Sequence, residues 1–293
     1  MTQEELNSLL TETNSLFQHI FYFKQIFDIL PSKEHVGTRI AYTDVLPRTD
    51  DFLKELRKTI IDWVYSQEKS KSIFESRFQQ THDFANAMAH VDVLAKSKFR
   101  PGHPKGQFGE LLLFNFIQFF FRAPPLLRKM PLTTSSNMER FGVDAIHYGT
   151  DGVNNILYLG EAKCYTSSFN AALSKALESI TTTFNSLNSE LDLYVYDDFI
   201  TPSLQEIAEK YKNNALEKVR YELICMLVYE ENDFTGMNQR EKEEAITQSI
   251  ETKTRSFDKT KFDSIDSALL SKIHYIFFPI HDIETLLSKF ESL

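Results

Sequence analysis

The chain has 293 residues, an apolar share of 42% and a formal net charge of −9. This length is enough for one large or two modest domains with a buried core, so folding requires neither disulfides nor a structural metal. The negative charge argues against a protein that coats nucleic acid by bulk electrostatics. It does not exclude an enzyme that meets nucleic acid in one local groove.

The first 98 residues predict a mainly helical region. Residues 2–17 fit a short helix, and residues 19–30 fit either a helix or a strand. Asp50 is a candidate N-cap for a helix over 51–66, in which the apolar residues recur at helical spacing. A further helix is predicted over 71–97.

The segment 97–107 combines two prolines, two glycines and three basic residues, and it predicts a boundary. We therefore expect a second domain over 99–293, in which helices alternate with strands around a mixed central sheet, as in α/β proteins. The expected helices cover 108–122, 169–188, 203–219, 238–254 and 281–290, and the expected strands cover 141–148, 157–165, 221–230 and 272–280.

The sequence also bears on the compartment of the protein. Cys164 and Cys225 are far apart and fit no zinc-ligand spacing, so we expect reduced thiols and a cytoplasmic location. The N-terminus lacks a basic segment followed by an apolar one, and we expect no secretory signal. The longest apolar run, 111–121, is too short to span a bilayer and predicts a buried helix.

Charged residues interrupt two predicted strands that a turn-rich segment joins into a hairpin. Asp144 lies in the first strand, and Glu161 and Lys163 lie in the second. If Tyr148 faces Leu157, then Asp144 faces Glu161, although a slip of one residue would undo this pairing. Because side chains alternate along a strand, Glu161 and Lys163 point to the same face.

Two opposed carboxylates repel each other unless a cation lies between them. Mg²⁺ prefers oxygen ligands, and Asp144, Glu161 and the backbone carbonyl of Ala162 would supply three. Lys163 would lie beside them, where it could orient a water molecule or offset charge on a phosphate. The pattern therefore predicts a metal-dependent phosphodiesterase site.

Glu110 is a fourth candidate, because it is the only acid in the apolar helix predicted over 108–122. Helical spacing places it on the same face as Phe114 and Ile117, and a carboxylate directed at a core needs a partner such as a metal ion. The alternative is an acid in the first helical turn, where the helix dipole stabilises it.

Simpler interpretations exist for the other polar residues. Asp144 could lie at an exposed hairpin edge, and most Glu-x-Lys tripeptides are solvated. His82, His90 and His103 have no zinc-ligand spacing and fit a helix or loop surface. The segment 97–107 fits an ordinary loop, although its residues Arg100, His103 and Lys105 could contact a DNA backbone. Lys175, on the helix predicted over 169–188, could also contact DNA.

The order of Glu110 on a helix, then Asp144, then Glu161-Ala162-Lys163 on consecutive strands resembles the PD-(D/E)xK nuclease superfamily. The resemblance covers residues 105–230 and implies a restriction-endonuclease-like core of the order α-β-β-β-α-β. In that pattern Asp144, Glu161 and Ala162 hold Mg²⁺, with Mn²⁺ as a substitute, while Glu110 completes or supports the shell and Lys163 is catalytic. Val143 stands where the signature has proline.

A narrower resemblance rests on the segments GQFGELLLF, FGVDAIHY and LYLGEAKCY. They are similar to the HamA effector nucleases of Hachiman antiphage defence. This resemblance implies a DNA endonuclease that works with HamB, a helicase partner that senses DNA and restrains the nuclease, and the acidic surface would suit docking to it. Two alternatives stay open: a non-catalytic docking subunit with a nuclease fold, and an RNA-directed nuclease.

Overall fold

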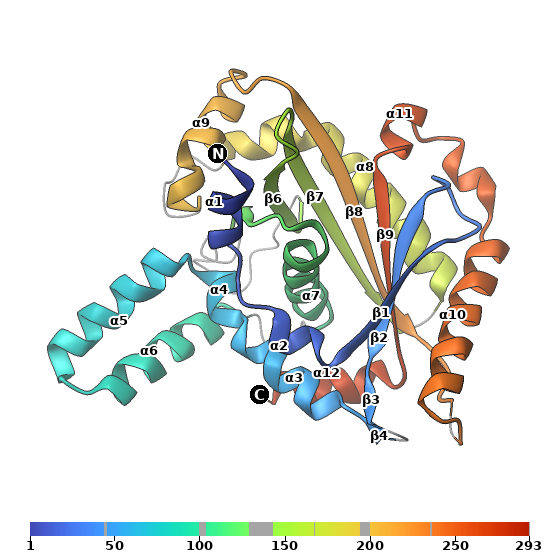
Figure 1. Cartoon of the computed structure of the whole chain (residues 1–293), viewed down its shortest axis with the longest axis horizontal. Coiled ribbons are helices and arrows are strands. Elements are labelled where there is room, and N and C mark those ends of the chain that lie inside the picture. Colours follow the sequence, from blue (N-terminus) through green and yellow to red (C-terminus); the bar gives the residue numbers. More distant parts are fainter. Residues whose placement is uncertain are drawn as a thin grey trace.

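The computed structural model describes residues 1–43, 46–99, 104–128, 143–166, 168–193, 200–234 and 236–292. Its centre is a mixed sheet of seven strands in the order β1-β2-β9-β8-β7-β6-β5 (Figure 1). The strands are β1 (Ile20–Ile26), β2 (Glu34–Ile40), β5 (Pro125–Leu127), β6 (Ala145–Thr150), β7 (Asn155–Tyr165), β8 (Val219–Glu230) and β9 (Ile273–Ile280). The predicted α/β class with a mixed central sheet is confirmed.

Four adjacent strands, β2, β9, β8 and β7, run parallel, while β1, β6 and β5 are antiparallel to their neighbours. The segments 223–229 of β8 and 275–280 of β9 are buried throughout. This is the pattern expected of parallel strands covered by helices on both faces. A separate two-stranded sheet consists of β3 (Tyr42–Thr43) and β4 (Leu46–Pro47).

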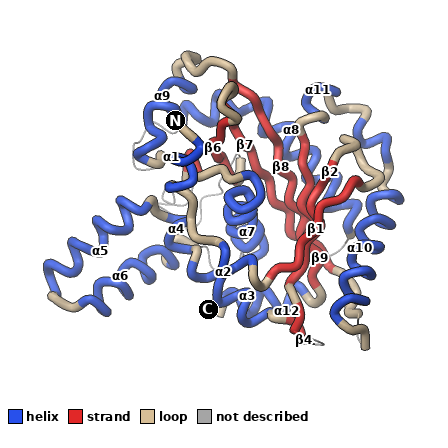
Figure 2. Tube along the Cα trace, in the orientation of Figure 1, coloured by secondary structure: helices blue, strands red, loops and turns tan. Residues whose placement is uncertain are grey.

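Helices cover both faces of the sheet (Figure 2). On one face the core is built around α7 (Pro104–Phe121), together with α2 (Asn14–Phe17), α3 (Thr49–Lys58), α4 (Ile60–Val64) and α12 (Ile283–Glu291). On the other face it is built around α8 (Phe169–Leu193), with α1 (Gln3–Ser8), α9 (Gln205–Lys212) and α10 (Gln239–Ser256). Side chains of β7 alternate between these two cores, which fixes the face on which each of its polar residues lies.

Two helices project from the body as a hairpin, α5 (Gln67–Thr81) and α6 (Phe84–Lys96) (Figure 1). The prediction of one helix over 71–97 was wrong at His82, which adopts a left-handed conformation with φ 52°. The chain therefore turns there, and the side chain of Asp83 caps the start of α6 by accepting a hydrogen bond from Asn86 N–H.

Other boundaries also differ from the prediction. Residues 2–17 form two short helices, and the ambiguous segment 19–30 contains the strand β1. The helix expected over 51–66 is divided at Thr59 into α3 and α4. The helix expected over 203–219 ends at Lys212, close to Asn214, which has a left-handed φ of 53°. The remaining short helices are η3 (Pro202–Leu204), η4 (Lys259–Phe262) and α11 (Ser267–Leu270).

The N-terminal region contributes to the same sheet and core as the rest of the chain. Strands β1 and β2 extend the sheet beyond β9, and Phe17, Phe52 and Trp63 pack in one cluster with α7. The division into domains 1–98 and 99–293 stays a prediction. Cys164 and Cys225 are free. Within the described ranges, no helix is both long and apolar enough to cross a membrane.

Candidate functional site

The candidate site begins where β6 and β7 pair. The register is as predicted, because Tyr148 pairs with Leu157 and Ala145 pairs with Gly160. Asp144 immediately precedes Ala145 and is thus brought to the level of Glu161 on β7. The predicted register is therefore confirmed as far as Ala145 and Gly160, and a direct pairing of Asp144 with Glu161 stays a prediction.

The regular pairing of β6 with β7 ends at Ala145, and Asp144 continues it with hydrogen bonds of its own. Its N–H donates to the carbonyl of Gly160 (3.1 Å), and its Oδ2 accepts a hydrogen bond from the N–H of Ala162 (2.9 Å). In an extended strand the N–H and C=O of one residue point to the same edge. The carbonyl of Ala162 is therefore directed to the edge where β6 has ended and where Asp144 lies.

Glu161 lies on the face of β7 that α8 covers, and it is only 3% exposed. Its Oε1 accepts hydrogen bonds from Lys163 Nζ (2.5 Å) and from Ser179 Oγ of α8 (2.7 Å). Its Oε2 is buried and has no hydrogen-bond partner among the described residues. A buried carboxylate oxygen without a partner is costly in free energy, so this atom is where an added cation would be stabilised.

Lys163 shares the face of Glu161, as the alternation along the strand predicted. Burial acts to lower the pKa of Lys163, but the nearby carboxylates of Glu161 and Asp144 outweigh it and raise that pKa above its ordinary value. Lys163 is therefore protonated at neutral pH. The site therefore holds a positive charge near two carboxylates.

Glu110 lies on the opposite side of β7. The helix begins at Pro104 rather than near residue 108, so Glu110 is beyond the first turn and the interpretation as a dipole-stabilised first-turn acid was wrong. A Cβ atom on its neighbour Gly109 would lie 3.3 Å from the Cβ of Ala162. Glu110, which is half-buried, thus approaches the level of Ala162 from the α7 face, whereas Glu161 lies on the α8 face.

The donor set suits a hard divalent cation in part. Asp144, Glu161 and the carbonyl of Ala162 occupy neighbouring positions where β6 ends beside β7, and all three supply oxygen donors of the kind that Mg²⁺ prefers. In the part of the chain that the structure describes, no group of three His, Cys, Asp or Glu side chains is arranged to hold a metal ion. Glu110 therefore does not complete a metal-binding cluster with Asp144 and Glu161 in this arrangement.

The sequence did not predict a role for Ser179, whose hydroxyl donates a hydrogen bond to Glu161 Oε1. It lies one helical turn after Ala176 and two after Ala172, and both alanines are buried, so helical spacing was the available signal. The hydroxyl fixes Oε1 and leaves Oε2 as the open atom of the carboxylate.

The other candidates lie away from this cluster or outside the described ranges. Lys105 Nζ donates to Thr166 Oγ1 (3.4 Å) on the surface, and Lys175 pairs with Glu178 (2.7 Å). Arg100 and His103 lie outside the residues that the structure describes. Contacts of these residues to DNA stay a prediction.

The family model HamA matches residues 15–292, which is nearly the whole chain. The match begins in α2 and ends just after α12, so it includes the strands of the candidate site and both edges of the sheet. No curated protein sequence matches the chain.

Proposed function

The chain belongs to the HamA family and is a component of Hachiman antiphage defence; from this membership we propose that it acts as a metal-dependent DNA endonuclease with a PD-(D/E)xK fold. The observation that carries the proposal is the buried Oε2 of Glu161, which has no hydrogen-bond partner among the described residues, whereas Oε1 of the same carboxylate accepts a hydrogen bond from Lys163. A carboxylate held in this way is explained by a cation that binds there.

The order of elements supports the fold assignment. The helix α7 carries Glu110, the antiparallel strands β5, β6 and β7 follow, and α8 then leads through α9 to the parallel strand β8. This is the order α-β-β-β-α-β that the superfamily resemblance implies. The acidic residues lie at the end of the strand pair, where the ladder opens.

Asp144, Glu161 and the carbonyl of Ala162 would hold the metal ion, and Glu110 would support it from α7. When bound, Mg²⁺ supplies Lewis acidity: it polarises a phosphate oxygen and favours deprotonation of water. Lys163 remains protonated and donates to an oxygen on which negative charge develops during phosphodiester cleavage. Ser179 keeps the Glu161 carboxylate in one orientation.

The proposed partner is the helicase of the same defence system. The formal net charge of −9 makes a large non-specific contact with DNA unfavourable, so a partner that binds DNA would bring the substrate to the site. The acidic surface also suits docking to a basic surface of that partner.

The test is cleavage of plasmid DNA by the purified chain together with its Hachiman partner, in Mg²⁺ and in EDTA. We expect cleavage in Mg²⁺ only, and a loss of roughly 100-fold or more in Asp144→Asn, Glu161→Gln and Lys163→Met, because each removes a metal ligand or a transition-state contact. Glu206→Gln, which removes an exposed carboxylate from α9, is the matched control and should cleave at the wild-type rate.

Cleavage that persists in EDTA or in Glu161→Gln would contradict the proposal. A labelled RNA of the same sequence is tested alongside, and preferential RNA cleavage would overturn the assignment to DNA. Binding of Mg²⁺ to the isolated, folded chain is measured by titration calorimetry. A nuclease that shows no cleavage in the assay should still bind Mg²⁺ at this site, whereas a non-catalytic subunit should not.

A further inference from the structure

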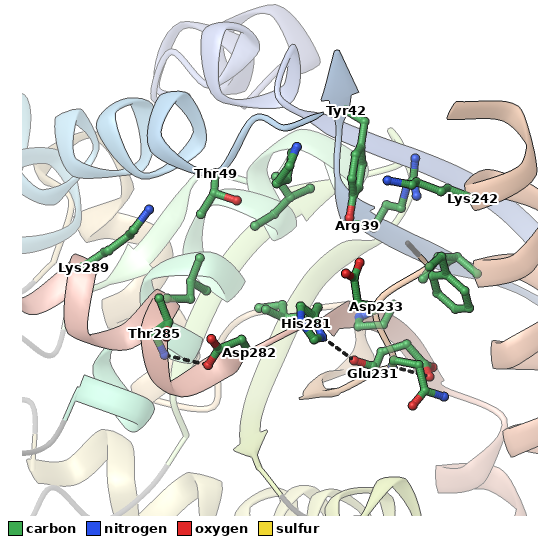
Figure 3. A pocket seen from close by; sticks show the side chains of 18 of the residues that line it. Arg39, Tyr42, Thr49, Glu231, Asp233, Lys242, His281, Asp282, Thr285 and Lys289 are labelled. Atoms are coloured by element: carbon green, nitrogen blue, oxygen red, sulfur yellow. Dashed lines mark hydrogen bonds between the residues drawn. The ribbon is translucent and has the colours of Figure 1, made fainter. Parts of the chain in front are cut away.

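A second site lies at the carboxyl ends of the parallel strands β2, β9 and β8, and its residue Arg39 on β2 is three strands away from β7, which carries Glu161. There a pocket of about 350 Å³ opens between α10 and the start of α12 (Figure 3). Its polar lining includes Arg39, Tyr42, Asp233, Lys242 and Asp282. Open α/β sheets bind ligands in crevices outside the carboxyl ends of their strands, and this volume is in the range of small-molecule sites.

Arg39 is the feature of this pocket that the fold alone does not explain. It is 3% exposed, and its Nε and Nη2 atoms are buried without a hydrogen-bond partner among the described residues. The guanidinium carbon lies 4.6 Å from the ring centroid of Tyr42 and 5.7 Å from that of Phe21. The rings hold the guanidinium plane, but they leave its donors unsatisfied, which is unfavourable in a buried position.

A second buried cation lies beside it. Lys242 of α10 is 3% exposed, and its Nζ lies 3.9 Å from the ring centroid of Tyr42. Tyr42 thus lies against both Arg39 and Lys242, and Figure 3 shows the three side chains grouped on one wall of the pocket. Burial lowers the pKa of Arg39, with an opposing effect of the nearby Tyr42 and Glu243, yet an arginine stays charged in proteins. This wall therefore carries two cationic side chains, and the carboxylate of Asp233 lies near Tyr42.

Two acidic side chains of the pocket have partners of their own, and a third, Asp233, lies near Tyr42. Glu231 pairs with Lys253 (3.0 Å), and Asp282 accepts a hydrogen bond from Thr285 N–H (3.1 Å) at the start of α12. Asp233 has interactions of its own. None of these carboxylates is within hydrogen-bonding distance of the buried donors of Arg39.

We propose that this pocket binds a small organic phosphate of the size of a nucleoside monophosphate, with its phosphate against Arg39 and Lys242. The planar guanidinium matches the geometry of phosphate oxygens, and the two buried donors of Arg39 that have no partner among the described residues can bind two of them. Phe234, Ile246 and Leu286 also line the pocket and provide an apolar surface for the organic part. The site shares no residue with the proposed nuclease centre, so it does not depend on that function.

The experiment measures binding of adenosine monophosphate, inorganic phosphate and succinate to the full chain by calorimetry and by thermal unfolding. We expect adenosine monophosphate to raise the unfolding temperature in a dose-dependent way, since a ligand that binds only the folded state stabilises it. Arg39→Gln and Lys242→Gln should each weaken its affinity at least tenfold. Arg240→Gln is the matched control, because Arg240 lies on the same helix but is exposed, and it should bind as the wild type does.

Because a change at a buried arginine can impair folding, Thr285→Trp provides a second variant. Thr285 is exposed and lines the pocket, so a tryptophan there would fill the pocket while Arg39 stays in place, and binding should be lost. Absence of binding by all three anions, or equal affinity in wild type and Arg39→Gln, would overturn the proposal. Binding of succinate without binding of either phosphate compound would overturn the assignment to a phosphate.

Discussion

The two members of the Glu161–Lys163 ion pair differ in their surroundings. The Glu161 side chain is 4% exposed and that of Lys163 is 25% exposed. The cost of burial thus falls mainly on the carboxylate, and Lys163 is the cation that compensates it in the metal-free protein. A buried pair of this kind destabilises the protein most when only one partner is removed.

This asymmetry predicts a non-additive mutant cycle. Lys163→Met should lower the free energy of unfolding by about 2 kcal/mol, toward the low end for a buried pair since Lys163 is partly solvated. Glu161→Gln in the same chain should restore most of that loss, because the uncompensated charge is gone. Urea denaturation of the single and double variants in EDTA measures the coupling.

Lys175→Met is the control for this cycle. Lys175 is an exposed lysine of α8 that pairs with the exposed Glu178, so its removal should change the stability by no more than about 0.5 kcal/mol. If the two single substitutions at Glu161 and Lys163 add without coupling, the pair does not compensate a buried charge.

At the residue scale, the sequence predicted contacts within the hairpin and missed contacts between distant segments. The alternation along β7 placed Glu161 and Lys163 on one face, and the turn-rich segment set Asp144 at their level. Ser179 and Arg39 were missed because their roles depend on packing between segments far apart in the chain. The one local signal at Arg39 was a charge in the strand EHVGTRI, which is buried over most of its length.

At the scale of elements, the position of the candidate site depends on how closely α7 approaches β7. Gly160 is the contact point: a Cβ there would lie 2.8 Å from Leu113 Cδ2 and 2.9 Å from Ile117 Cδ1. Because Gly160 has no side chain, α7 packs directly against β7 at the residue before Glu161. A larger residue must push the helix away or distort the end of the strand.

Gly160→Val should therefore lower the free energy of unfolding by about 1–3 kcal/mol, the usual range for an overpacked core. It should also reduce Mg²⁺ affinity, since Glu161 and Ala162 follow directly. The control is Gly106→Ala on the exposed side of α7, where the nearest atom is 3.9 Å away. That change should stabilise the helix by about 0.5–1 kcal/mol. Thermal unfolding and metal titration measure both, and an undisturbed Gly160→Val protein would show that this close packing is not required.

Most helices and strands were predicted in type, and the errors concern their ends. The apolar strands β8 and β9 and the charged helix α10 lie close to where they were predicted. The breaks at His82 and Thr59 were missed, because a left-handed residue or a change of helix direction leaves the apolar pattern almost unchanged. The ambiguous segment 19–30 became a strand only because β2 offers it a partner.

At the scale of the whole molecule, the sheet joins the two ends of the chain. Val36 of β2 pairs with Ile276 of β9, a contact that local periodicity does not predict. His35 lies at this junction: its Nδ1 accepts a hydrogen bond from Tyr275 N–H (3.2 Å), and its Nε2 lies 3.0 Å from the carbonyl of Pro31. A backbone N–H only donates and a carbonyl only accepts, so His35 is neutral with its proton on Nε2. If Nδ1 were protonated, its N–H would face the N–H of Tyr275, and two donors would meet without an acceptor.

The junction should therefore weaken in acid. Burial lowers the pKa of His35 to about 4, from 6.5 in the unfolded chain. The unfolded state then binds more protons between these values, so the stabilisation is complete above pH 6.5 and is lost as the pH falls toward 4, at up to about 1.4 kcal/mol per pH unit. His35→Gln keeps one donor and one acceptor but does not titrate. Urea denaturation from pH 7.5 to 4 should show a shallower decline of stability for this variant than for the wild type.

The difference between the two curves isolates His35 from other acid-sensitive groups. His147, whose pKa burial lowers to about 3, remains in both proteins and affects both curves equally. Parallel curves for the wild type and His35→Gln would show that the junction between β2 and β9 tolerates a protonated histidine. A divergence that begins below pH 6.5 would instead make this junction, where the N-terminal strands meet the rest of the sheet, a point at which acid weakens the whole fold.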